Sequence, residues 1–157
     1  REAVEPICDA FYSTGFQAAR AATKENSLAK EAVRLAREKA DKVVLATNPL
    51  FPMAGQKTRL SWLGLAPEDF DLVTCYTSDR HCKPNPDYYR DILATLNLKP
   101  ENCVMVGNDV QEDMVAETLG MKVFLLTDCL INEKSADITK YPQGGFEELK
   151  TFITKLI

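Results

Sequence analysis

The chain has 157 residues, of which 45% are hydrophobic and 27% are charged, and this is enough for one domain with its own core. Its formal net charge is −4, and no basic stripe that would suit a polyanion is visible, so we expect no nucleic-acid partner. No apolar run approaches the roughly 20 residues of a membrane helix, and we therefore expect no membrane segment.

The cysteines do not suggest a disulfide framework. There are five of them, an odd number without paired close spacing: Cys8, Cys75, Cys82, Cys103 and Cys129. Cys75, His81 and Cys82 could be read as zinc ligands, but no fourth ligand falls at a zinc-finger spacing. A reduced, cytoplasmic protein is the simpler expectation.

The first 26 residues stand apart from the rest of the chain. They are rich in alanine and aromatic residues, and Phe11, Tyr12 and Phe16 recur at helical spacing around an interruption at Gly15. Two interpretations are open: an N-terminal arm, or the last part of a helical insertion that begins further upstream.

From residue 27 onward, helical and strand patterns alternate. A helix is predicted from an N-cap at Ser27, and Val43–Ala46 reads as a strand buried on both faces. Further helices are predicted near 56–63, after Pro86, over 111–119 and after Gly144-Gly145, and further strands over 72–76, 103–106 and 123–126. Such alternation predicts a parallel sheet with helices on both faces.

Polar residues follow three of these strands. They are Thr47 and Asn48 after the first strand, Lys83 after the second, and Asn108, Asp109 and Asp113 after the third. Ligands in open α/β sheets bind beyond the carboxyl ends of the strands. A hydroxyl, an ammonium and hard oxygen ligands at one edge would suit a phosphate group held beside Mg²⁺.

Each of these residues also has a plain structural explanation. Thr47 could simply end a strand, Lys83 could be a solvated lysine, and the two aspartates could stabilise a helix N-terminus through the macrodipole. Their common order, each at the end of a strand, favours a site over three unrelated structural roles.

Three segments resemble motifs of the haloacid dehalogenase superfamily. Residues 44–48 (VLATN) resemble its motif II, residues 83–86 (KPNP) its motif III, and residues 104–113 (VMVGNDVQED) its motif IV. The resemblance spans about residues 28–130. It implies an α/β fold with a three-layer Rossmann-like core and a parallel sheet over residues 27–157, with residues 1–26 as the remnant of a helical cap.

The resemblance also implies residue roles. Thr47, with Asn48, would bind the phosphoryl oxygens, and Lys83 would neutralise charge on the phosphoryl group and the nucleophile. The acids of motif IV would hold Mg²⁺. The family pattern has an acid directly after the glycine, where this chain has Asn108. We therefore expect Asn108 or Asp109 as the direct ligand, with Asp113 in support.

The aspartate pair of the family's motif I is not found in this chain. An Asp-x-Asp pattern occurs at Asp69 and Asp71, but it lies between motifs II and III and precedes its strand, whereas motif I follows one. Asp9 is no better, because residue 11 is not an acid. We expect the nucleophile in a missing N-terminal segment of the same protein.

These observations predict part of a Mg²⁺-dependent phosphohydrolase that acts on a small phosphorylated metabolite through an aspartyl-phosphate. The chain alone is expected to be inactive. Two alternatives remain: a 2-haloacid dehalogenase-type hydrolase, which would lack the acids of motif IV, and a non-catalytic phosphate-binding or scaffold protein that has lost motif I.

Overall fold

In the computed structural model, which describes residues 4–156, the chain divides into two compact units, one ending at Asp79 and one starting at Arg80. Each unit is described here by itself. Among the described residues, no helix is both long enough and apolar enough to cross a membrane.

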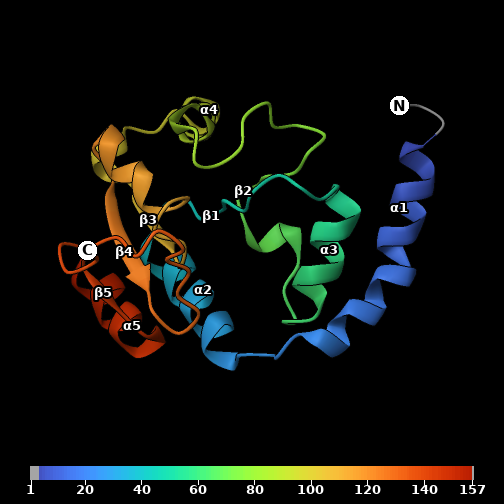
Figure 1. Cartoon of the computed structure of the whole chain (residues 1–157), viewed down its shortest axis with the longest axis horizontal. Helices are drawn as coiled ribbons and strands as arrows, with labels where there is room; N and C mark the ends of the chain where they lie inside the picture. The colour runs from blue at the N-terminus through green and yellow to red at the C-terminus, as the bar shows by residue number, and fades with distance from the viewer. Residues whose placement is uncertain (1–3, 157) are drawn as a thin grey trace. The chain divides into compact units, whose positions relative to one another are not determined.

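The first unit contains α1 (Glu5–Ser13), the 3₁₀ helix η1 (Gly15–Ala22), α2 (Ser27–Lys39), β1 (Val44–Leu45), α3 (Met53–Ser61), the 3₁₀ turn η2 (Pro67–Asp69) and β2 (Leu72–Val73). The second contains α4 (Pro86–Leu96), η3 (Pro100–Asn102), β3 (Val104–Gly107), η4 (Met114–Leu119), β4 (Lys122–Leu126), β5 (Gln143–Gly144) and α5 (Phe146–Lys155) (Figure 1).

Every strand pair in the described residues is parallel, as the alternation of helices and strands predicts. The pairs fall into two sheets: β1 with β2 in the first unit, and the order β3-β4-β5 in the second. Strand β4 lies in the middle of its sheet, and four of its five residues are buried, which explains its uninterrupted apolar sequence. The α/β class with a parallel arrangement is confirmed.

Strands β1 and β3 are each paired along one edge only among the described residues. The carbonyls of Val43 and Leu45 accept hydrogen bonds from Asp71 and Thr74, and the carbonyl of Cys103 accepts one from Lys122. Backbone groups of alternate residues point to opposite edges of a strand. The backbone groups of the intervening residues therefore point to the edge that has no strand partner.

Several predicted boundaries need correction. The N-cap of α2 is Asn26, whose side chain accepts from the N–H of Leu28, and not Ser27. The segment expected as a helix over 111–119 is only a short 3₁₀ helix, η4, and β5 was not predicted. The predicted stops are confirmed, since Gly64 and Gly120 both have positive φ, a conformation that glycine adopts without strain.

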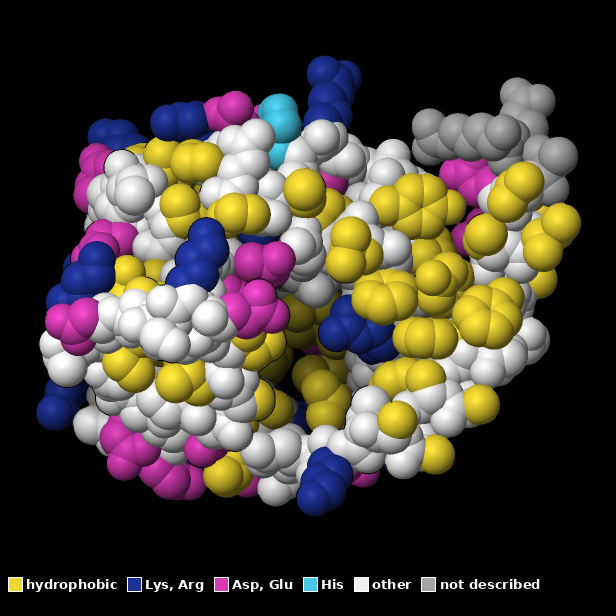
Figure 2. Space-filling model, in the orientation of Figure 1, with side chains coloured by type: hydrophobic (Ala, Val, Ile, Leu, Met, Phe, Trp, Pro, Cys, Tyr) yellow, Lys and Arg dark blue, Asp and Glu magenta, His cyan; other side chains and the backbone are white. Residues whose placement is uncertain are grey.

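Residues of the N-terminal segment pack against α3 in the first unit. Tyr12 and Phe16 make ring contacts with Phe51, and Phe16 also contacts Trp62. Ile7 and Phe11 of α1 are exposed, although the Phe11 ring also contacts Tyr12 and Phe16, and Figure 2 shows hydrophobic side chains gathered over this region. The described units divide at residue 79, so the assignment of residues 1–26 to a cap remains a prediction.

Both aspartates of the discarded Asp-x-Asp pattern have structural partners. Asp69 accepts from the backbone N–H of Ala66 and closes the turn of η2. Asp71 accepts from the guanidinium of Arg37, the ammonium of Lys42 and the backbone N–H of Val43. The hydrogen bond from Val43, followed by the one from Lys42, lowers the pKa of Asp71. Asp71 thereby ties the end of α2 and the start of β1 to β2.

We predict that Asp71→Asn destabilises the chain at pH 7, and that its difference from the unmodified chain fades as the pH falls. The folded-state pKa lies below the unfolded value of roughly 3.9, so this carboxylate stabilises the fold above about pH 4 and the contribution is lost below it. Urea unfolding between pH 7 and pH 3 measures this, with Asp41→Asn as the control. A difference that does not change with pH would contradict the assignment.

Candidate functional site

Lys83 lies in the loop that leads into α4. The loop is shaped by a turn in which the N–H of Asn85 donates to the carbonyl of Cys82, and by a cis peptide bond between Lys83 and Pro84. Asn85 also caps α4 by accepting from the N–H of Asp87. With Pro86 at the first helical position, these residues start the helix directly after the lysine, as the sequence predicts.

The loop after β3 is organised by its own aspartates. Asp109 Oδ1 accepts from the backbone N–H groups of Gln111 and Glu112, which forms a tight turn. Asp113 Oδ2 accepts from the backbone N–H of Asp109 at 3.0 Å. A Cβ atom on Gly107 would lie 2.1 Å from Asp113 Oδ2, so only glycine fits at this position.

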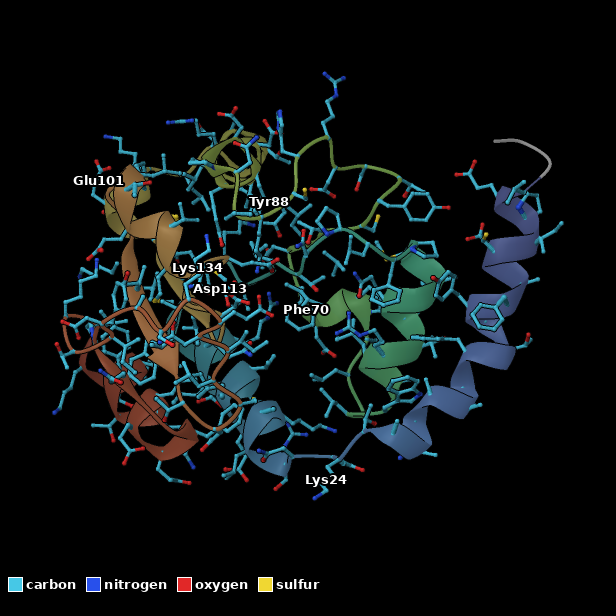
Figure 3. The ribbon with its side chains drawn as sticks, in the orientation of Figure 1. Lys24, Phe70, Tyr88, Glu101, Asp113 and Lys134 are labelled. Atoms are coloured by element: carbon cyan, nitrogen blue, oxygen red, sulfur yellow. The ribbon has the colours of Figure 1, made fainter. Side chains whose placement is uncertain are left out.

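These two loops meet in a buried ion pair. The ammonium of Lys83 donates to Asp113 Oδ1 at 2.6 Å, and the two side chains are 7% and 5% exposed. Tyr88 of α4 places its ring 5.8 Å from the same ammonium. Figure 3 labels Asp113 and Tyr88, whose side chains come from these two different segments of the second unit. The predicted motif III lysine and motif IV aspartate are thus brought together.

Tyr89 supports this pair from the next position of α4. Its hydroxyl donates to the backbone carbonyl of Glu112 at 2.8 Å. Burial, and then the nearby charge of Asp113, raise the pKa of Tyr89, so the phenol stays neutral and remains a donor. The polar role of Tyr89 could not be read from the helical pattern after Pro86.

The Asn108 side chain is turned toward a neighbouring segment. Its amide Nδ2 donates to the carbonyl of Cys129 at 2.7 Å, and its own carbonyl accepts from the N–H of Ile131. An amide nitrogen is only a donor, so the Oδ1 oxygen is the atom of Asn108 that can serve as a ligand, and the hydrogen bond to Cys129 orients it.

Thr47 and Asn48 belong to the first unit and follow β1. The carbonyl of Thr47 accepts from the hydroxyl of Thr74 at 2.6 Å, and the carbonyl of Thr74 accepts from the buried amide of Gln56. The carbonyl of Asn48 accepts from the N–H of Leu50. Thr74 therefore shapes the loop that carries Thr47. Sequence reasoning missed this role, although a hydroxyl at the end of an apolar strand was a signal for it.

The donor set for a metal ion is small. Within residues 4–156 no group of three histidine, cysteine or acidic side chains is arranged to hold a metal ion. Both oxygens of Asp113 already accept hydrogen bonds, from Lys83 and from the backbone. The second oxygen of Asp109 and the amide oxygen of Asn108 offer hard donors of the kind that Mg²⁺ prefers. These two oxygens could provide part of the ligand set of a cation, and the remaining ligands would have to come from other groups.

Parallel strands that alternate with helices carry these loops and their buried lysine–aspartate pair, an arrangement of the α/β class. The model of the haloacid dehalogenase-like hydrolase family matches residues 9–116, more than half of the chain, and the chain belongs to this family. No protein among those with curated functions matches it in sequence.

Solved structures share the fold at low sequence identity. An uncharacterized protein from Listeria monocytogenes is 16% identical with a TM-score of 0.61, covering 82% of this chain and 78% of that one. A HAD phosphatase from Thermococcus onnurineus is 21% identical with a TM-score of 0.59, covering 78% of this chain and 55% of that one. CbbY from Rhodobacter sphaeroides, solved with phosphate, is 18% identical with a TM-score of 0.62, covering 85% of this chain and 63% of that one. The chain thus spans only part of the latter two.

We predict that Lys83→Met destabilises the chain by about 3–5 kcal/mol, because it leaves the Asp113 carboxylate buried without its cation. The double variant Lys83→Met with Asp113→Asn should be less destabilised than Lys83→Met alone. Urea unfolding of the two single variants and the double variant forms a cycle that measures the coupling. Additive effects would show that the ion pair does not hold these loops together.

Proposed function

We propose that this chain is part of a Mg²⁺-dependent phosphohydrolase acting on a small phosphorylated substrate. The observation that carries the proposal is the buried contact between Lys83 and Asp113, which joins the loops that resemble motifs III and IV. A cation held in a dry environment by one carboxylate suits the stabilisation of a transferring phosphoryl group. The family membership supports the hydrolase class, and the substrate class rests on the site residues.

Each residue has a distinct role in this proposal. Lys83 supplies a positive charge to the phosphoryl oxygens, and Asp113 holds that ammonium in place. Thr47 donates its hydroxyl to a phosphoryl oxygen, and Asn48 contributes beside it. Tyr89 keeps the Asp113 loop fixed to α4 through the Glu112 carbonyl.

Asn108 and Asp109 would hold the metal ion through the amide oxygen and the second carboxylate oxygen. Asp113 serves in support, since its oxygens are engaged by Lys83 and by the N–H of Asp109. The ion would supply positive charge beside the phosphoryl group. Because Mg²⁺ prefers six near-octahedral oxygens, the remaining ligands would be water and groups from outside this chain.

In this proposal the nucleophile would come from outside the chain, from a segment that carries the family's motif I. By the family resemblance, that segment includes a strand, which would pair with a strand edge that is open in this chain. The single paired edge of β1 and of β3 supports this proposal, because unpaired edges of apolar strands invite strand addition. An aspartate at the end of that strand would attack phosphorus, and a second would transfer protons.

We also propose that residues 1–26 are the last portion of a helical cap. The apolar side chains of Ile7 and Phe11 in α1 are exposed, and this supports the proposal. The rest of a cap domain would provide apolar surface against which these side chains could be buried. Specificity for the substrate would then depend mainly on residues outside this chain.

We predict that the 157-residue chain releases no nitrophenol from p-nitrophenyl phosphate in the presence of Mg²⁺, because it lacks a nucleophile. A longer form that includes motif I should be active, should lose activity on chelation, and should lose at least about 100-fold in kcat/KM with Asp109→Asn. Asp137→Asn, which removes the same charge at an exposed residue that has no assigned role, serves as the control.

Two results would contradict this function. Activity of the 157-residue chain that is abolished by Thr47→Ala would show that the nucleophile is present. A longer form that releases halide from a 2-haloacid without added metal, and no phosphate from phosphate esters, would favour the dehalogenase alternative.

We predict weak binding of Mg²⁺ to the isolated chain. Two oxygens from one loop cannot replace most of the hydration shell of the ion, so calorimetry should show no saturable binding at micromolar concentrations. The longer form should bind more tightly. Stoichiometric, tight binding by the isolated chain would mean that further ligands have been overlooked.

A further inference from the structure

A groove of about 380 Å³ lies in the first unit between α2 and the segment that follows α3. Val33 and Leu65 form the apolar part of its lining, and Gly64 also lines the groove. The volume falls in the range of small-molecule sites, which start near 300 Å³. The groove contains none of the residues that we assign to phosphoryl transfer.

Three cationic side chains from one face of α2 line the groove: Lys30, Arg34 and Arg37. They are spaced at i, i+4 and i+7, so they project from the same side of the helix. Like charges at this spacing repel one another and destabilise an isolated helix. Sequence analysis did not identify this row, because three cations over eight residues do not form a stripe long enough for a polyanion.

The cations of this row differ in their partners. The guanidinium of Arg37 donates to Asp71 and is thereby held in place, with other N–H groups still available as donors. In the part of the chain that the structure describes, neither the ammonium of Lys30 nor the guanidinium of Arg34 has a hydrogen bond or an ion pair with a protein group. Lys30 Nζ lies 2.7 Å from the position that a Cβ atom on Gly64 would occupy, so a side chain there would displace the ammonium.

The two acidic residues of the groove do not neutralise these charges fully. Asp69 is engaged with the backbone N–H of Ala66, and Glu38 lies exposed one turn beyond Arg34. Two cations without a protein acceptor therefore face a concave surface whose size suits a small molecule. A ligand with two or more negative charges would relieve the repulsion along α2.

We infer that this groove binds a small polyvalent anion of the phosphate or diphosphate class, with Lys30 and Arg34 as its main contacts and Arg37 as an ordered third donor. The site is separate from the proposed catalytic residues, and it does not depend on the proposed function. Arginine and lysine side chains in one row can contact several phosphoryl oxygens at once, which favours a diphosphate over a monovalent anion.

The test is a titration of the 157-residue chain with pyrophosphate, followed through the backbone amide signals by NMR. Saturable shifts are expected at residues 30–38 and 64–69. Lys30→Gln with Arg34→Gln should weaken the affinity at least tenfold. The matched control is Lys24→Gln with Lys39→Gln, which removes the same charge outside the groove and should change the affinity less than twofold; Figure 3 labels Lys24 in the segment before α2.

A third variant separates this groove from the proposed phosphoryl site. Thr47→Val should leave the shifts at residues 30–38 intact, whereas their loss in Thr47→Val would place the anion at the other site and overturn the inference. Absence of saturable shifts in the unmodified chain would also overturn it, as would equal weakening by the two double variants. Arg34→Gln alone, at an exposed position, provides the same comparison if the double variant does not fold.

Discussion

The buried pair of Lys83 and Asp113 is the interaction on which the candidate site depends. Two opposite charges with less than a tenth of their side-chain surface exposed are stable only together, because either one alone would be an uncompensated charge in a poorly solvated environment. The pair fixes the loop before α4 to the loop after β3, although the two residues are 30 positions apart in the chain. The second oxygen of Asp113 then holds the backbone of Asp109, and the close approach of Asp113 requires glycine at position 107.

Structural and chemical roles coincide in this loop. Asp109 uses one oxygen to form a turn and keeps the other available, while Asn108 uses its amide nitrogen to hold the segment at Cys129 and keeps its oxygen available. A side chain that is fixed through one atom presents its other atom in a defined direction, at a lower entropic cost than a mobile side chain would incur. The structural explanation for each polar residue therefore does not compete with the functional one.

Acidic residues elsewhere show that a pattern alone does not define a site. Asp69 and Asp71 match the spacing of a catalytic pair, yet one closes a turn and the other binds two cations and a backbone N–H. Their position before β2, and not after a strand, was visible in the sequence and was sufficient to set them aside. The cations of α2 are the opposite case, because their significance lies in the groove that they line and not in their spacing.

The sequence by itself determined the local features of this protein. Backbone preferences determine that a helix starts at Pro86 and that helices end near Gly64 and Gly120. The hydrophobic pattern determines the apolar run that becomes β4. Both act over only a few residues. The order of polar residues after the strands also indicated the family. These inferences required no knowledge of which segments meet.

Only the tertiary structure decided how the polar groups are paired. No local rule shows that Lys83 meets Asp113, that Tyr89 donates to the carbonyl of Glu112, or that Thr74 holds the carbonyl of Thr47. The pattern of residues 111–119 also did not show that this segment forms only the short 3₁₀ helix η4. Contacts between distant segments are set by how the elements pack, and the pattern of any one segment carries no information about its partner.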